Sequence, residues 1–143
     1  MQDHPVPLKI DLTPNWAITL NQQFTQRYVG ETLNLFNQSI GLWIRCYNVE
    51  GGPNILERME RDTAAAPANA TDQTKGIQGG LGRVTYIVPA DEAATPPEPA
   101  KLYTHTHASD SELMIVFMLK AEGSLAAAKE MYESLAYLES GGF

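Results

Sequence analysis

The last third of the chain, Leu102 to Leu138, constrains the fold more than any other stretch. Apolar and polar side chains alternate from Leu102 to His107, which is typical of a strand with one buried face. Leu113 to Leu119 is almost wholly apolar, as in a strand at the centre of a sheet. Because the four residues Ala108 to Ser111 between them are polar and small, we expect the two strands to form a hairpin.

An amphipathic helix is predicted directly after this hairpin. Ser124 follows a glycine and is a favourable N-cap residue. The helix is expected to reach Leu138, before the glycine pair Gly141-Gly142. Its apolar positions recur at helical spacing and would pack on the sheet: Leu125, Ala128, Met131, Tyr132, Leu135 and Leu138.

The first half of the chain has the alternation of a β-meander, with polar turns between the strands. The expected strands are Val6–Leu12, Trp16–Leu20, Phe24–Val29, Thr32–Phe36 and Ile40–Val49. A short helix follows, with Pro53 in its first turn and an end near Ala66. Ile55, Leu56, Met59 and Asp62 follow its inner face, whereas Glu57, Arg58, Glu60 and Arg61 are expected to face solvent.

Three segments are predicted to be loops. Residues 64–74 are small and polar without periodicity, and residues 89–99 are rich in alanine, proline and acidic groups. Residues 76–82 contain four glycines and lead into a strand, Arg83 to Val88. We therefore expect a single α+β domain over residues 1–143: an antiparallel β-sheet meander, a short mid-chain helix, and a C-terminal amphipathic helix packed on the sheet.

Charge and composition exclude several classes of function. A net charge of −7 argues against nucleic-acid binding, and it favours either simple solubility or a docking face for a basic partner. No segment has the apolar length of a membrane span. Cys46 is the only cysteine and is expected to be structural. The sequence as written predicts a cytoplasmic protein, or a periplasmic one if a signal peptide has been removed.

Two histidines, His105 and His107, share one face of a predicted strand. Asp110 and Glu112 follow them and could supply oxygen ligands to a metal. The third histidine, His4, belongs to a distant segment, so a polar strand face turned to solvent is the favoured interpretation.

Other catalytic patterns are missing from the sequence. The glycine run 76–82 precedes a strand and lacks the Gly-Lys-Ser/Thr ending of a phosphate loop, so a tight turn is favoured there. No serine or cysteine carries a nucleophile signature. Surface solvation accounts for Glu57, Glu60, Asp62, Asp91, Glu92, Asp110 and Glu112. Trp16 and Trp43 are expected in the core, and we predict neither an enzyme nor a cofactor.

The order of elements over residues 6–138 resembles the PsbP-like α/β/α sandwich superfamily. The resemblance rests on a Pro-x-Trp turn at residues 14–16, a helix after Pro53, a Gly-Arg-Val-Thr-Tyr strand at 82–86 and a Met-Tyr-x-Ser-Leu helix at 131–135. Asn15 departs from the glycine or aspartate usual before the tryptophan. The resemblance implies a bacterial protein of type VI secretion that acts by binding, either an immunity protein or an effector chaperone.

The preferred function from the sequence is therefore an immunity protein that occludes the active site of a secreted toxin. Its partner-binding residues are predicted to be Asp91, Glu92, Asp110, Glu112, Gly79 and Gly80. The alternatives are an effector-loading chaperone with an apolar groove and a small metal-dependent hydrolase that uses His105 and His107. A homodimer and an accessory role in the periplasm stay open.

Overall fold

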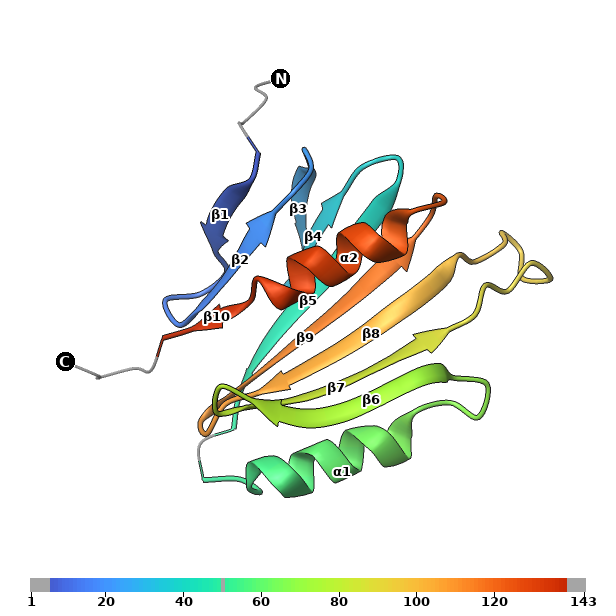
Figure 1. Cartoon of the computed structure of the whole chain (residues 1–143). Helices are drawn as coiled ribbons and strands as arrows, with labels where there is room; N and C mark the ends of the chain where they lie inside the picture. Colours follow the sequence, from blue (N-terminus) through green and yellow to red (C-terminus); the bar gives the residue numbers. More distant parts are fainter. Residues whose placement is uncertain (1–5, 50, 139–143) are drawn as a thin grey trace.

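A computed structural model of the chain describes residues 6–49 and 51–138. Within this part the chain forms two antiparallel sheets and two helices (Figure 1). The bounds are β1 Leu8–Asp11, β2 Trp16–Leu20, β3 Thr25–Val29, β4 Thr32–Phe36, β5 Ile40–Asn48, α1 Ile55–Ala65, β6 Thr71–Gln78, β7 Leu81–Val88, β8 Ala100–His107, β9 Ser111–Leu119, α2 Ser124–Glu133 and β10 Ala136–Tyr137. His4 and the pair Gly141-Gly142 lie outside the described residues.

The larger sheet has seven strands in the order β3-β4-β5-β9-β8-β7-β6. Its centre is the pairing of β5 with β9, which runs in register from Ile40 opposite Leu119 to Asn48 opposite Ser111. Alternate residues of β9 are completely buried on one face, where Leu113, Ile115 and Phe117 are each 0% exposed. The apolar run predicted from sequence is thus a central strand, and the β8–β9 hairpin is confirmed.

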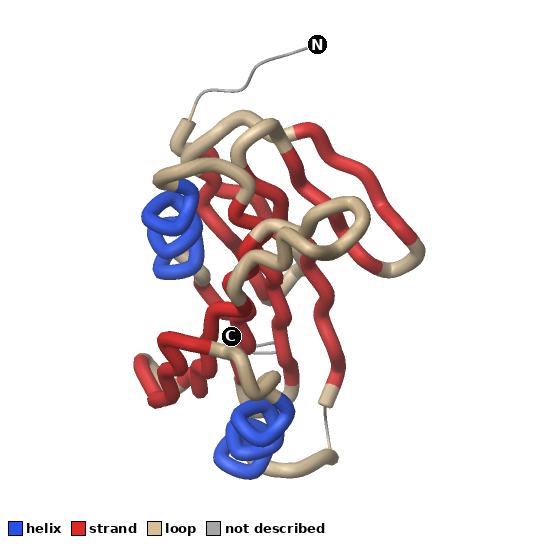
Figure 2. The backbone as a smooth tube through the Cα atoms, turned by 90° about the vertical axis from the view of Figure 1, so that its right-hand side faces the viewer, coloured by secondary structure: helices blue, strands red, loops and turns tan. Residues whose placement is uncertain are grey.

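The smaller sheet, β1-β2-β10, and helix α2 cover one face of the larger sheet. Trp16 and Ile18 of β2 join Met131 of α2 in the same core cluster as the inward residues of β9. Helix α1 lies on the opposite face, as the two views together show (Figure 2). The core therefore sits between α2, β2 and the large sheet, and a second, smaller contact lies under α1.

Helix α1 differs in two respects from its prediction. Asn54 is the N-cap, because its side-chain oxygen accepts a hydrogen bond from the Glu57 backbone at 2.9 Å, so Pro53 lies outside the first turn. Arg58 was expected in solvent but is 1% exposed, since it turns inward beside Met59 and Asp62. Its charge is accommodated by backbone carbonyls and neighbouring carboxylates rather than by water.

The loop predictions for residues 64–74 and 76–82 are wrong in part. Residues 71–78 form β6, an edge strand in which every residue is exposed. The strand is formed by backbone pairing with β7 and not by burial, so its sequence has no apolar alternation. Gly79 and Gly80 make the turn into β7 with φ angles of +60° and +81°, a conformation that favours glycine. The segment 89–99 is a loop apart from one bridge between Asp91 and Glu98.

The terminal helix is shorter than predicted. It ends at Glu133, and Ala136 and Tyr137 instead pair with β2. Ser134 marks the change, because its hydroxyl accepts a hydrogen bond from the Thr19 backbone at 2.8 Å. Leu135 stays buried at 7% exposure, whereas Leu138, expected on the apolar stripe, is 68% exposed.

These elements confirm an α+β fold that is dominated by antiparallel sheet. Trp16 is in the core as expected, but Trp43 is only partly buried. Cys46 is a free, exposed residue of β5. Neither described helix has the length and apolar character that crossing a membrane would require.

Candidate functional site

A cluster of charged side chains is buried between α1 and the sheet. Helix α1 contributes Arg58 and Asp62, strand β8 contributes His107, and strand β9 contributes Glu112. Their exposed fractions are 1%, 6%, 0% and 8%. The sequence interpretation of Asp62 and Glu112 as solvated surface carboxylates, and of His107 as part of a solvent face, is therefore wrong. Register explains the error, since His107 and Glu112 are direct cross-strand partners on the face that α1 covers.

His107 lies between the two carboxylates. Its Nε2 contacts Asp62 Oδ2 in a short hydrogen bond, and its Nδ1 is 3.2 Å from Glu112 Oε1. Only the doubly protonated imidazolium donates from both nitrogens. Burial lowers the pKa of His107, but the hydrogen bonds to Asp62 and Glu112 outweigh it, so the net pKa is raised.

Glu112 is the second half of this ion pair. Burial raises its pKa, but the hydrogen bond from His107 and the charge of Arg61 reverse that effect, and the net pKa of Glu112 is lowered. Arg61 Nη2 lies 2.9 Å from Glu112 Oε1 while much of the arginine side chain remains in solvent. The carboxylate is therefore held ionised at the rim of the cluster.

Arg58 ties the cluster to the turn of the β8–β9 hairpin. Its Nη2 donates to the Ala108 carbonyl at 2.6 Å, and its Nε donates to the Pro53 carbonyl at 3.0 Å. Its Nη1 is 3.4 Å from His107 Nδ1. Burial lowers the pKa of this guanidinium, although Glu112 and Asp62 oppose that effect. One buried side chain thus fixes both the start of α1 and the path of the turn.

His105 stands beside this network without joining it. Its Nδ1 is buried, lies 3.9 Å from Asp62 Oδ1, and has no hydrogen-bond partner among the described residues. Burial lowers the pKa of His105 more than the charge of Asp62 raises it. The pKa values of the two histidines on this strand face are therefore shifted in opposite directions.

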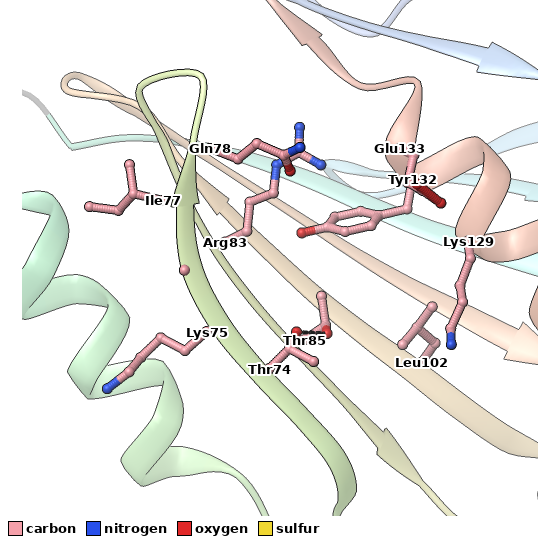
Figure 3. Close-up of a pocket in the computed structure, with 11 residues that line it drawn as sticks. Thr74, Lys75, Ile77, Gln78, Arg83, Thr85, Leu102, Lys129, Tyr132 and Glu133 are labelled. Carbon is pink, nitrogen blue, oxygen red and sulfur yellow. Dashed lines mark hydrogen bonds between the residues drawn. The ribbon is translucent and has the colours of Figure 1, made fainter.

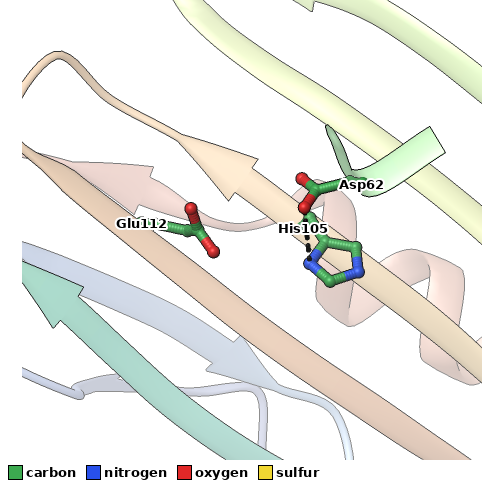
Figure 4. Close-up of side chains that lie close together, drawn as sticks. All are labelled: Asp62, His105 and Glu112. Carbon is green, nitrogen blue, oxygen red and sulfur yellow. Dashed lines mark ion pairs between the residues drawn. The ribbon is translucent and has the colours of Figure 1, made fainter. Parts of the chain in front are cut away.

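Asp62, His105 and Glu112 are the described residues that could hold a metal ion. One ligand atom from each lies within 4.8 Å of the others, although the side chains come from three different elements (Figure 4). Arg61 already pairs with Glu112, and Arg58 packs beside His107. A divalent ion about 5 Å from one guanidinium is repelled by about 6–7 kcal/mol at an effective dielectric constant of about 20. The arginines therefore favour a closed ion-pair network over a metal centre.

The hairpin turn above this cluster is bordered by three cavities. We call the turn Ala108–Glu112, with the residues that line these cavities, the hairpin corner. The cavities have volumes of about 220, 410 and 520 Å³. They are lined respectively by Thr13, Asn15, Cys46, Tyr47, Asn48, Asp110, Ser111 and Tyr137; by Tyr47, Asn48, Val49, Arg61, Asp62, Glu112 and Met114; and by Gly52, Pro53, Asn54, Ile55, Leu56, Arg58 and Ser109.

The turn is held from several sides. Ser111 accepts a hydrogen bond from Trp16 Nε1 at 2.8 Å, and the Asp110 carbonyl accepts one from the Val49 backbone at 3.2 Å. The Asp110 carboxylate accepts a short hydrogen bond from the Tyr137 hydroxyl. Together with the Arg58 hydrogen bond from α1, these contacts come from β2, β10 and the residue that follows β5, so the turn has a fixed shape that the rest of the fold dictates.

The predicted partner-binding residues fall at two ends of the sheet. Asp110 and Glu112 belong to the hairpin corner, and the Gly79-Gly80 turn lies at the same end, because Gly82 pairs with His107 (Figure 1). Asp91 and Glu92 lie at the opposite end, in the loop between β7 and β8. Asp91 is used locally, since its carboxylate accepts hydrogen bonds from the backbones of residues 93 and 94.

Sequence reasoning missed Arg58 and Asp62 as site residues. They are separated by one helical turn, and both lie on the side that carries Ile55 and Met59. A charged pair at i, i+4 within an apolar stripe is a signal for a buried ion pair. The partners on β8 and β9 are more than 40 residues away, so the pattern alone could not name them.

Comparison with known proteins informs the fold alone. No protein family matches the chain in sequence, and no curated protein matches it. A crystal structure from Bacteroides thetaiotaomicron is similar, with a TM-score of 0.65 and 13% sequence identity. The match covers 88% of this chain and 46% of that one, so this chain spans about half the length of its structural neighbour.

Proposed function

We propose that this chain is a binding protein that neutralises a partner protein, as an immunity protein neutralises a toxin, by presenting the hairpin corner to the partner's cleft. The observation that carries the proposal is a turn that is anchored by hydrogen bonds from β2, α1 and β10 and bordered by three cavities. An anchored turn loses little conformational entropy when a partner binds it. The assignment to the PsbP-like superfamily and to type VI secretion belongs to this proposal and rests on the sequence resemblance.

The contact chemistry follows from what the corner offers. Ser109 and Asn48 are exposed, Asp110 is half-buried beside them, and Leu56 is 61% exposed at the start of α1. A partner with basic groups around a cleft would be steered by the net charge of −7. At the turn it would meet Asp110, because Glu112 is buried and paired with Arg61 and His107. Leu56 would then supply an apolar contact at the rim.

Two features weigh against the alternatives. Among the large exposed apolar residues of the described chain, Tyr28 lies on β3 and Ile77 on β6, at opposite edges of the large sheet, so they do not form one groove for a transmembrane client. The arginines beside His107 and Glu112 oppose the metal that a hydrolase based on His105 and His107 would need. A toxin-binding function requires neither a groove nor a metal.

The test is growth rescue in the native host when the neighbouring reading frame is expressed with this protein. Asn48→Arg and Ser109→Arg place bulk and positive charge on exposed corner positions, and urea unfolding of each variant checks that the buried cluster beneath them is intact. We expect each to abolish rescue and to weaken binding of the purified partner at least about 100-fold. Glu92→Arg makes a similar change on an exposed residue at the opposite end of the sheet, and it should leave both readouts unchanged.

Rescue by all three variants would refute the corner as the binding surface. Loss of rescue with Glu92→Arg alone would move the site to the loop between β7 and β8. A neighbouring gene product that does not harm the host when expressed alone would contradict the immunity function itself.

A further inference from the structure

A separate cleft lies between β6 and α2, on the face of the large sheet that α1 does not cover (Figure 3). Its volume is about 540 Å³, which is within the range of small-molecule sites. Strands β7 and β8 supply its floor through Arg83, Thr85 and Leu102. The remaining lining residues are Thr74, Lys75, Gly76, Ile77, Gln78, Lys129, Tyr132 and Glu133. The function proposed above does not use this cleft.

The walls of the cleft are mainly hydrocarbon. They include the side chain of Leu102, the ring of Tyr132 and the methyl groups of Thr74 and Thr85. Ligand sites for small molecules are typically of this kind, apolar with a few polar groups that fix the orientation. The cleft therefore suits a compact molecule whose body is apolar.

Three buried polar groups lie together at or beneath the cleft. They are Tyr132 Oη, Arg83 Nε and Thr106 Oγ1, and all three atoms are buried. Tyr132 as a residue is 9% exposed, and the guanidinium carbon of Arg83 lies 5.1 Å from the centre of its ring. Burial raises the pKa of Tyr132, and hydrogen bonding with Thr106 and Arg83 opposes that effect, so the three groups lie close together. Of the three, Arg83 and Tyr132 line the cleft, and the guanidinium of Arg83 is the charged group that a ligand there could reach.

The charge at the cleft has the sign opposite to that of the whole chain. Besides Lys75, the charged residues that line the cleft are Arg83, Lys129 and Glu133. Neither Arg83 nor Lys129 belongs to an ion pair among the described residues. Lys75 does not contribute, because its ammonium group turns toward α1 and contacts Glu60 at 2.6 Å (Figure 3). A site with net positive charge on a chain of net charge −7 selects an anionic ligand.

We propose that this cleft binds a small apolar molecule that carries one carboxylate. The carboxylate would lie against Arg83, and the apolar body would lie along the Tyr132 ring toward Leu102, while Lys129, on the other side of that ring, adds to the positive potential of the cleft (Figure 3). Arginine forms bidentate hydrogen bonds with a carboxylate, which gives the site its polarity and orientation. The limited volume restricts the ligand to one molecule of moderate size.

The test is isothermal titration of the purified chain with decanoate, with 1-decanol and decylammonium as probes of the same chain length. We expect saturable binding of decanoate with one site per chain, and no binding of the other two. Arg83→Gln should weaken decanoate binding at least about tenfold, because a charge-assisted hydrogen bond is removed. Lys129→Glu reverses an exposed charge without disturbing the core and should have an effect in the same direction.

Matched controls separate a site from general attraction. Arg27→Gln removes another arginine that stacks on an aromatic ring, at 5.0 Å from the ring of Phe36, and Lys9→Glu reverses another exposed lysine. Both controls should bind decanoate as the wild type does. Equal binding of decanoate and 1-decanol, equal loss in the control variants, or no decanoate binding at millimolar concentration would each overturn the proposal.

Discussion

The bridging imidazolium of His107 makes a sharp prediction about the pH dependence of stability. The variant His107→Gln retains a polar side chain of similar size but cannot carry the charge or donate to Asp62 and Glu112 in the same geometry. Removing one member of a buried ion pair costs about 3–5 kcal/mol in the free energy of unfolding. We expect a loss of about 3 kcal/mol at pH 5.5, where His107 is protonated.

The sign of the pH effect follows from the raised pKa of His107. Because His107 has a higher pKa in the folded chain than in the unfolded chain, its protonation stabilises the fold. This stabilisation is complete at pH values below the unfolded pKa of about 6.5. This contribution disappears as the pH rises through the folded value. The advantage of the wild type over His107→Gln should therefore shrink with rising pH above 6.5, by at most about 1.4 kcal/mol per pH unit.

His105→Gln is the matched control, because its pKa is shifted the other way. The unfolded chain takes up a proton at His105 before the folded chain does, so the wild type should lose stability relative to this variant as the pH falls below 6.5. Urea unfolding at half-unit steps from pH 5 to 8.5 measures both differences. This range stays above the pH at which the stabilising contribution of Glu112, whose pKa is lowered, is lost.

The two difference curves are expected to slope in opposite directions. A wild-type advantage over His107→Gln that is constant across the range would mean that His107 is not a charged bridge. An advantage that increases with pH would reverse the sign and refute the reasoning outright.

Three further predictions concern packing, the turn and metal. Gly82→Ala should lower the free energy of unfolding by about 1–3 kcal/mol, because the new methyl group would lie 2.5 Å from side-chain atoms of Ile55 and Met59. Gly76→Ala is the control, since its methyl group meets no atom within 4 Å and should change the free energy of unfolding by less than about 0.5 kcal/mol. Urea unfolding measures both. Arg58→Lys keeps the charge but loses the paired donors to Pro53 and Ala108, so amide exchange in the turn should accelerate while α1 keeps its circular dichroism. Zinc at about 100 μM should stabilise the folded chain by less than about 0.4 kcal/mol, and a thermal shift of several degrees would contradict the closed ion-pair network.

Much of the fold was predictable because strands and helices with one buried face carry apolar residues at regular spacing in the sequence. The alternation in Trp16–Leu20 and Ile40–Asn48 and the apolar run of β9 each correspond to a face packed against the core. Strand β6 has no such spacing, since its eight residues are all exposed and the strand is formed by backbone pairing with β7. Helix α2 stops before its apolar pattern does, because pairing of Ala136 and Tyr137 with β2 outweighs one more helical turn.

Of the candidate site, only the turn between β8 and β9 was predictable from the sequence. The polar turn Ala108–Ser111 stands out in the sequence, and the structure gives it a defined shape. The cluster beneath it depends on a helix and two strands meeting, so the roles of Asp62 and His107 are decided by tertiary contacts. In the local sequence each of them is an isolated polar residue, and most such residues in folded proteins are exposed to solvent.

The pairing of β10 with β2 has a consequence for how the protein is made. Contacts such as Asn15 to Leu138 and Trp16 to Ser111 join parts of the chain 123 and 95 residues apart. On a ribosome that adds about 5–20 residues per second, β2 would wait about 6–25 s for its last partner. During that interval β2 can pair with β1 but not with β10. The yield of folded protein is therefore expected to respond to the rate of synthesis.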